Sequence, residues 1–137
     1  MLLDSSLRRT GFLREAVDRL GVASRVRVVT DRAEVAGRSP DLRSSFDAVV
    51  ARSFGPPAVT AECAAGFLPA GGFLVVSEPP ADEEPGDRWP DTGLAELGFG
   101  PAARLGTATA GFVRIRRVED HDRWPRRVGI PAKRPRW

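Results

Sequence analysis

Short apolar runs alternate with helix-like segments along most of the 137-residue chain, and this alternation constrains the fold more than any other feature. Strands are predicted at 25–29, 46–52 and 73–77, where β-branched or aromatic residues lie between turn residues. Helices are predicted at 6–20 and 57–68, the second with proline in its first turn. Strands that alternate with helices are typical of an α/β protein with a parallel sheet.

The end of the chain follows a different pattern. Two further strands are predicted at 102–109 and 112–118, and Ala110-Gly111 lies at the short turn between them. A connection of this length joins antiparallel strands in a hairpin. We therefore expect an α/β sheet with one antiparallel edge. With 42% apolar residues, a chain of this length has enough material for the core of one domain.

The helix predicted at 6–20 carries apolar residues at helical spacing. Phe12, Leu13, Val17 and Leu20 are expected to form one buried face. A glycine directly after this stretch ends the helix. The sequence therefore predicts that the helix packs on the sheet through that face.

Charge is unevenly distributed along the chain. Residues 1–113 hold 12 basic and 15 acidic side chains, whereas residues 114–137 hold 9 basic and 3 acidic ones. This asymmetry favours contact between the basic C-terminal segment and a polyanion. The alternative is a solvated basic tail that binds nothing, and the charges alone do not decide between the two.

Several classes of protein do not fit the composition. Cys63 is the single cysteine and His121 the single histidine, so an internal disulfide is impossible and no metal site is expected. No run approaches the length of about twenty apolar residues that crosses a membrane, and the N-terminus has no signal-peptide pattern. We expect a cytoplasmic protein that does not contact a membrane.

Six short motifs are spread from one end of the chain to the other. They are Leu2-Leu3-Asp4-Ser5, Arg8-Arg9, Phe12-Leu13-Arg14, Asp31-Arg32-Ala33-Glu34, Ala51-Arg52-Ser53-Phe54 and the run from Trp124 to Pro135. In order and spacing, they resemble the C-terminal part of the small-subunit (16S) ribosomal RNA guanine-N7 methyltransferase G family, also called glucose-inhibited division protein B. The proline- and arginine-rich run is the most specific of the six.

This resemblance implies a partial class I methyltransferase (Rossmann-like) sheet at 1–118, followed by a basic C-terminal tail at 119–137. It implies S-adenosylmethionine as the cofactor, and 16S ribosomal RNA or the small ribosomal subunit as the partner. The family's first strand and glycine-rich loop have no counterpart in the chain. Gly71-Gly72 does not replace the loop, because these glycines follow a predicted helix and precede a strand.

By the same resemblance, Leu2-Leu3-Asp4 is the end of the family's second strand. A sheet that lacks its first strand therefore has a gap between this strand and the strand that ends at Arg52. Unpaired backbone groups cost free energy when they are buried. Three outcomes are open: the flanking strands close up, another chain fills the gap, or the chain is a truncated product without activity.

The resemblance also implies a cofactor site. Asp4, with Ser5 beside it, would accept hydrogen bonds from the two ribose hydroxyls of S-adenosylmethionine. The alternative for Asp4 is an acid that stabilises a helix N-terminus. Arg32, Ala33 and Glu34 would lie over the adenine, or would form a solvated first helical turn.

Arg52 is the candidate catalytic residue on the substrate side, because it ends a predicted strand at the edge where α/β folds bind ligands. A salt bridge from Arg52 to Glu78 is the alternative. Methyl transfer to guanine N7 needs no general base, because this nitrogen already carries an in-plane lone pair, so positioning can supply much of the acceleration.

The basic tail is the candidate RNA contact. Its predicted RNA-binding residues are Arg126, Arg127, Lys133, Arg134 and Arg136, with Trp124 and Trp137 as stacking faces. The leading hypothesis is therefore methyl transfer to guanine N7 of 16S ribosomal RNA. The alternative is a non-catalytic RNA-binding remnant that uses the same tail.

Overall fold

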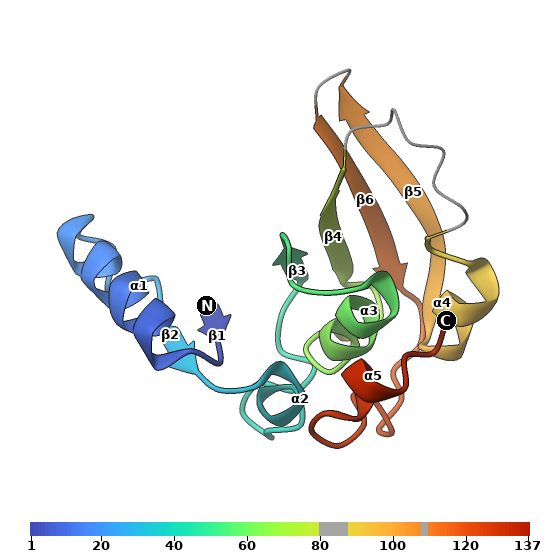
Figure 1. The fold of residues 1–137 in the computed structure, drawn as a ribbon, viewed down its shortest axis with the longest axis horizontal. Coiled ribbons are helices and arrows are strands. Elements are labelled where there is room, and N and C mark those ends of the chain that lie inside the picture. The colour runs from blue at the N-terminus through green and yellow to red at the C-terminus, as the bar shows by residue number, and fades with distance from the viewer. Residues whose placement is uncertain (80–87, 108–109) are drawn as a thin grey trace.

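The computed structural model describes residues 1–79, 88–107 and 110–137 (Figure 1). The elements in chain order are β1 (Leu2–Asp4), α1 (Leu7–Arg19), β2 (Val28–Thr30), α2 (Ala33–Ala36), β3 (Ala48–Ala51), α3 (Pro57–Ala65), β4 (Phe73–Glu78), α4 (Asp91–Glu96), β5 (Phe99–Thr107), β6 (Ala110–Arg117) and α5 (Ile130–Lys133). Every strand and long helix that the sequence predicts is present. The short helix α5 is not predicted by the sequence.

The strands form two separate sheets. β1 and β2 are parallel neighbours, and β3, β4, β6 and β5 form a second sheet in that order. β3 and β4 are parallel, whereas β6 is antiparallel to both β4 and β5. The predicted antiparallel hairpin is therefore confirmed, but its turn is not at Ala110-Gly111, because these two residues belong to β6 and pair with Thr107 and Gly106 of β5. Residues 108–109 lie outside the described part of the chain.

The expected gap lies between β1 and β3. Within the described residues, β1 pairs only with β2 and β3 pairs only with β4, so these two strands do not close up. Side chains, rather than backbone hydrogen bonds, connect the two parts, because Leu3 and Val49 pack against the same cluster around Phe67. Figure 1 shows β1, β2 and α1 at one end of the molecule and the four-stranded sheet at the other.

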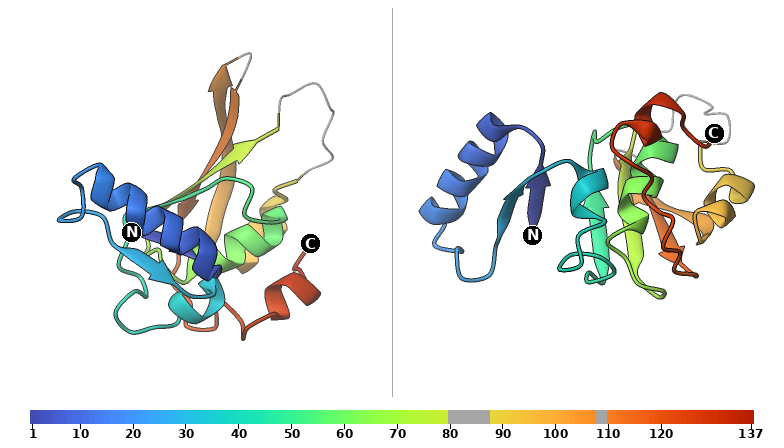
Figure 2. Two further views of the ribbon diagram at one scale, coloured as in Figure 1. Left: turned by 60° about the vertical axis from the view of Figure 1, so that its left-hand side comes forward. Right: turned by 90° about the horizontal axis from the view of Figure 1, so that it is seen from below.

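The main core lies between the four-stranded sheet and helices α3 and α4. Leu74, Val113 and Ile115 are buried on one face of the sheet, in one cluster with Leu68, which follows α3. Every residue of α3 after Pro57 is buried. This helix is enclosed because the sheet covers one side of it and the C-terminal segment covers another (Figure 2).

Helix α1 begins one residue later than predicted and packs differently. The Arg9 N–H donates to the Ser6 hydroxyl at the N-cap of the helix. The predicted buried face is confirmed only in part: Val17 is buried and Leu13 is half-buried, whereas Phe12 is 69% exposed and Leu20 is 74% exposed. Thr10 and Val17 are the buried residues of this helix. Phe12 and Leu20 are exposed because α1 packs mainly on the narrow sheet of β1 and β2, which covers a thin stripe of the helix.

Residues 119–137 pack on the rest of the protein and do not extend into solvent as a tail. Trp124 is 3% exposed, and its indole N–H donates to the Glu96 carbonyl (3.1 Å). Arg43 donates to the Trp124 carbonyl (2.8 Å) and to the His121 carbonyl (2.8 Å). Trp124 is therefore a core residue, and its predicted role as an RNA stacking face is wrong.

Two kinds of structure are not found in the part of the chain that the structure describes. None of its helices is long and apolar enough to cross a bilayer. The longest, α1, has 13 residues, whereas a membrane-spanning helix needs about 20. The described residues also contain no group of three or more His, Cys, Asp or Glu side chains that could bind a metal ion.

Candidate functional site

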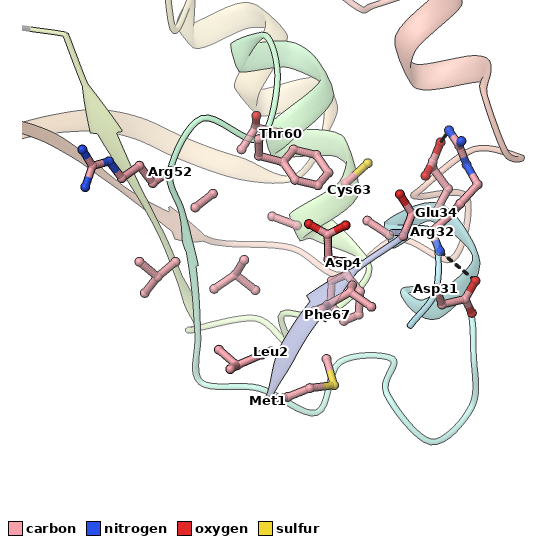
Figure 3. Close-up of a pocket in the computed structure, with 18 of the residues that line it drawn as sticks. Met1, Leu2, Asp4, Asp31, Arg32, Glu34, Arg52, Thr60, Cys63 and Phe67 are labelled. Atoms are coloured by element: carbon pink, nitrogen blue, oxygen red, sulfur yellow. Dashed lines mark hydrogen bonds and ion pairs between the residues drawn. The ribbon is translucent and has the colours of Figure 1, made fainter. Parts of the chain in front are cut away.

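A cavity of about 750 Å³ lies between β1 and β3 (Figure 3). Ligand sites in proteins typically have volumes of about 300–1,000 Å³. The wall includes the ends of both strands, the turn before α2, one side of α3 and one residue of α5. The lining residues that the sequence predicts as functional are Asp4, Ser5, Arg32, Ala33, Glu34 and Arg52. The structure therefore brings the predicted cofactor and substrate residues to one cavity.

Asp4 lies at the end of β1, and its carboxylate points toward the α3 side of the cavity (Figure 3). The Arg9 guanidinium donates to Oδ2 (2.7 Å), and the Ser6 N–H donates to Oδ1 (2.8 Å). These two contacts lower the pKa of Asp4 below its usual value of 3.8, with the Arg9 hydrogen bond as the larger cause. The carboxylate is therefore ionised at neutral pH, and its charged form is lost only as the pH falls through this lowered value.

The two interpretations of Asp4 are compatible with each other. Its contact with the Ser6 N–H is the helix N-terminal role. An ionised carboxylate has about four acceptor positions, and the two hydrogen bonds within the protein use half of them. The remaining positions are sufficient for two hydroxyl donors. Arg9 is a site residue that sequence reasoning missed. Its position, in the first turn of the helix that follows Asp4, could have indicated a contact with the Asp4 carboxylate.

The turn before α2 lies beside Asp4, because the Asp31 N–H donates to the Asp4 carbonyl (3.1 Å). Ala33 and Glu34 are buried, so a solvated turn is the wrong interpretation for these two residues. Arg32 is half-exposed, and its guanidinium donates to Glu34 Oε1 (3.1 Å). Within this turn, the Arg32 N–H donates to Asp31 Oδ1 (2.7 Å), and the Val35 and Ala36 N–H groups donate to the Arg32 carbonyl (3.0 Å each).

Glu34 is a buried carboxylate with two partners outside its own backbone. Oε1 accepts from the Arg32 guanidinium and also from the Gly129 N–H (3.1 Å). Burial alone would raise the pKa of Glu34, but the backbone N–H donors and Arg32 outweigh burial and lower this pKa below 4.5. Glu34 is therefore charged at neutral pH and fixes the chain near Gly129 against the cavity.

Arg52 follows the last residue of β3 and is exposed. Its guanidinium extends away from Asp4 (Figure 3). The alternative salt bridge to Glu78 does not form, because Glu78 instead forms an ion pair with Arg88 (3.0 Å) and accepts a hydrogen bond from the Trp89 indole N–H (3.1 Å). The next residue, Ser53, has a φ of 50°, a left-handed conformation that is unusual for a residue with a side chain. This turn directs the chain away from the sheet at the cavity wall.

The predicted RNA-binding residues fall into two groups. Arg126 forms a two-point ion pair with the buried Glu62, through Nε (2.8 Å) and Nη2 (2.6 Å). The guanidinium therefore has a structural partner, and its contact with RNA stays a prediction. Arg127, Lys133 and Arg134 are exposed, and their contact with RNA also stays a prediction. Sequence reasoning missed Glu62, because a single acid in an apolar helix gives no sign of a partner 64 residues away.

Cys63 lies on α3 at the cavity wall and is buried. Burial, followed by the nearby Glu34 and Glu62 carboxylates, raises the pKa of its thiol to about 12.

The thiolate is the reactive form of cysteine, so Cys63 in the native protein at pH 8 is expected to resist alkylation by iodoacetamide. Mass spectrometry should show modification only after urea unfolds the chain. Rapid labelling of the native protein would contradict this environment for Cys63.

Solved structures with a similar arrangement include S-adenosylmethionine-dependent methyltransferases. LaPhzM matches 85% of this chain and 42% of its own, with a TM-score of 0.64 and 18% identity. The O-methyltransferase NcsB1 from neocarzinostatin biosynthesis, solved with S-adenosylmethionine, matches 85% and 40%, with a TM-score of 0.63 and 15% identity. These likenesses show the fold alone, and they confirm the predicted fold class.

Sequence relatives define the family more narrowly. The model of the family described as rRNA small subunit methyltransferase G matches residues 1–83. The ribosomal RNA small subunit methyltransferase G of Pelotomaculum thermopropionicum is 35% identical over 149 positions, which cover 98% of this chain and 58% of the relative. The protein of that name from Prochlorococcus marinus is 48% identical over 75 residues, 55% of this chain and 30% of the relative.

The chain therefore belongs to the ribosomal RNA small subunit methyltransferase G family. It spans between 30% and 58% of the length of these two relatives.

Proposed function

We propose that this chain carries the nucleoside-binding and RNA-facing part of a cytoplasmic enzyme that transfers a methyl group from S-adenosylmethionine to guanine N7 of 16S ribosomal RNA. The observation that supports this most is Asp4, an ionised carboxylate at the end of a parallel strand, within a cavity that Glu34 also lines. A carboxylate in this position suits the vicinal hydroxyls of a ribose. Membership of the methyltransferase G family favours this function over a non-catalytic RNA-binding remnant.

The residues present fit the nucleoside half of the cofactor. Asp4, with Ser5 beside it, would hold the ribose, and the turn of Arg32, Ala33 and Glu34 would hold the adenine. The methionine half needs a close approach to the backbone, which glycine permits. No glycine is among the described residues that line the cavity. The fit therefore supports the nucleoside half, and the expected glycine-rich loop has no counterpart in this wall.

When bound, S-adenosylmethionine supplies an activated methyl group on its sulfonium centre. The residues of this chain need to bind and orient the two reactants, because guanine N7 reacts through its own lone pair and loses no proton. Orientation of this kind supplies a large share of the acceleration in many enzymes. Arg52 lies at the β3 end of the cavity wall, where it would contact the substrate side. Because the methylated base gains positive charge, Arg52 would hold a phosphate and not the reacting ring.

RNA would bind through its phosphates at the C-terminal segment. Arg127, Lys133 and Arg134 are exposed there, close to α5, and Ala132 of that helix lines the cavity. Contacts between basic side chains and phosphates hold folded RNA without reading its sequence. These residues make the small ribosomal subunit or its 16S RNA the proposed partner. Arg126 would hold this segment in place through its ion pair with the buried Glu62.

Titration calorimetry with S-adenosylmethionine tests the cofactor site. The variant Asp4→Asn keeps the size of the side chain and removes its charge. Hydrogen bonds to a charged group contribute about 1.5–3 kcal/mol each, and 1.4 kcal/mol is tenfold in affinity, so binding should weaken at least about tenfold.

The matched control is Asp18→Asn, the same change at an exposed position of α1, which should leave the affinity unchanged. Equal affinity for the wild-type protein and Asp4→Asn would remove Asp4 from the site. No heat from the wild-type protein, together with retained RNA binding, would instead support the non-catalytic alternative.

A further inference from the structure

The C-terminal segment is linked to the cavity by a single carboxylate. Glu34 lines the cavity and is buried, and the oxygen that accepts from Arg32 also accepts from the Gly129 N–H (3.1 Å). Gly129 is the N-cap of α5 and has a φ of 76°, a conformation that suits glycine. One buried acceptor therefore joins the turn beside Asp4 to the start of α5.

Helix α5 and the residues next to it contribute both to the cavity wall and to an exposed basic surface. Ala132 forms part of the cavity wall. Arg127 precedes Gly129 by two residues, and Lys133 is the last residue of the helix; both are exposed. A shift of α5 would therefore move the cavity wall and these basic side chains together.

A second buried carboxylate contacts the C-terminal segment without lining the cavity. Glu62 also holds the C-terminal segment, by accepting from the Arg126 N–H (2.9 Å) and from its guanidinium. Glu62 does not line the cavity, whereas Glu34 does. A ligand in the cavity would thus touch Glu34 or its turn directly and would leave Glu62 to its packing role.

We propose that Glu34 is a positioning residue that couples the two ligand sites, so that a nucleoside in the cavity and an RNA phosphate backbone at Arg127 and Lys133 each raise the affinity for the other. A nucleoside that orders the Arg32–Glu34 turn fixes the acceptor that holds Gly129, and so fixes α5 and the basic residues around it. Such coupling is reciprocal by thermodynamic necessity. This inference rests on the proposed function, because it takes the two ligands from it.

The test measures RNA affinity with and without the cofactor. The full chain is titrated into a fluorescein-labelled hairpin RNA from the small-subunit RNA, and anisotropy gives the Kd with no S-adenosylmethionine and at saturation. For the wild-type protein, the cofactor should strengthen RNA binding at least about fivefold, the low end of typical coupling between sites. In Glu34→Ala, this ratio should fall to about one.

Two kinds of variant separate coupling from folding. Glu34→Gln keeps a neutral acceptor for the Gly129 N–H and should restore a ratio above that of Glu34→Ala, which a simple loss of structure would not do. Arg127→Ala should weaken RNA binding both with and without cofactor, which places Arg127 in the RNA site. Glu15→Ala, on the exposed surface of α1, should leave both affinities unchanged. Circular dichroism confirms that each variant is folded at the assay temperature.

The possible outcomes can be told apart. A wild-type protein that binds each ligand but shows the same RNA Kd with and without cofactor overturns the coupling and leaves the proposed function intact. A Glu34→Ala variant that keeps the wild-type ratio removes Glu34 from the coupling. A wild-type protein that gives no calorimetric signal with S-adenosylmethionine overturns the proposed cofactor site, and the coupling with it.

Discussion

Replacement of Glu62 by alanine is expected to lower the free energy of unfolding by about 3–5 kcal/mol, the usual cost of removing one partner of a buried ion pair. Glu62 is fully buried in α3, and it accepts from the backbone N–H, Nε and Nη2 of Arg126. The Arg126 side chain is only 22% exposed. Without Glu62, the guanidinium would remain largely shielded from water with no anion beside it.

Urea unfolding followed by circular dichroism measures this loss. The control is Glu15→Ala, which breaks an exposed pair with Arg19 on α1 and should change the stability by about 0.5 kcal/mol or less. The double variant of Glu62→Ala and Arg126→Ala should lose less than the sum of the two single variants, because it leaves no unpaired charge. A loss near that of Glu15→Ala would show that the other contacts of the C-terminal segment hold it without this ion pair.

Substitution of Gly66 by alanine is expected to be almost as costly, at about 3 kcal/mol, the upper end of the usual range for overpacking. Gly66 ends α3 with a φ of −68° and a ψ of −23°, which alanine adopts without strain. Its added methyl group would lie 2.6 Å from the Gly37 carbonyl oxygen and 2.6 Å from Pro125 Cδ. Both neighbours belong to the backbone or to a rigid ring, so the chain itself would have to move.

Gly11→Ala is the matched control, because its new methyl group would meet nothing within 4 Å and would lie within α1. Alanine in a helix interior is more favourable than glycine by about 1 kcal/mol, so this variant should be more stable than the wild-type protein. The two glycine substitutions should therefore shift the urea midpoint in opposite directions. If Gly66→Ala left the urea midpoint unchanged, α3 and the segment at Pro125 would not be in close contact.

The order of elements could be predicted from the sequence because each depends on local patterns. Proline at the start of α3 and the short connection between β5 and β6 are signals of this kind. The placement of Asp4, Arg32 and Arg52 around one cavity also followed, since parallel strands end at the same edge of a sheet. The resemblance to the family supplied the chemistry for those positions.

The parts that sequence reasoning missed depend on contacts between distant segments. Helical spacing identifies Phe12 and Leu20 as apolar but does not show which of them meets another element, and both are exposed. The partners of Glu34 and Glu62 lie 95 and 64 residues further along the chain. A charge count of the C-terminal segment cannot separate Arg126, which pairs within the protein, from the exposed Arg127. Long-range pairing of this kind leaves no local pattern.

Because the strands form two separate sheets, the main chain of β1 and β3 forms part of the cavity wall. In the described chain, β1 and β3 each pair on one side only, so the other side of each strand presents peptide groups where the cavity lies. Every residue in such an edge, proline excepted, carries a donor and an acceptor whatever its side chain is. Alanine scanning will therefore underestimate the polarity of this wall, because it leaves the main chain unchanged. Substitution of Leu3 or Val50 by proline would remove a backbone N–H and so change the polarity of this wall.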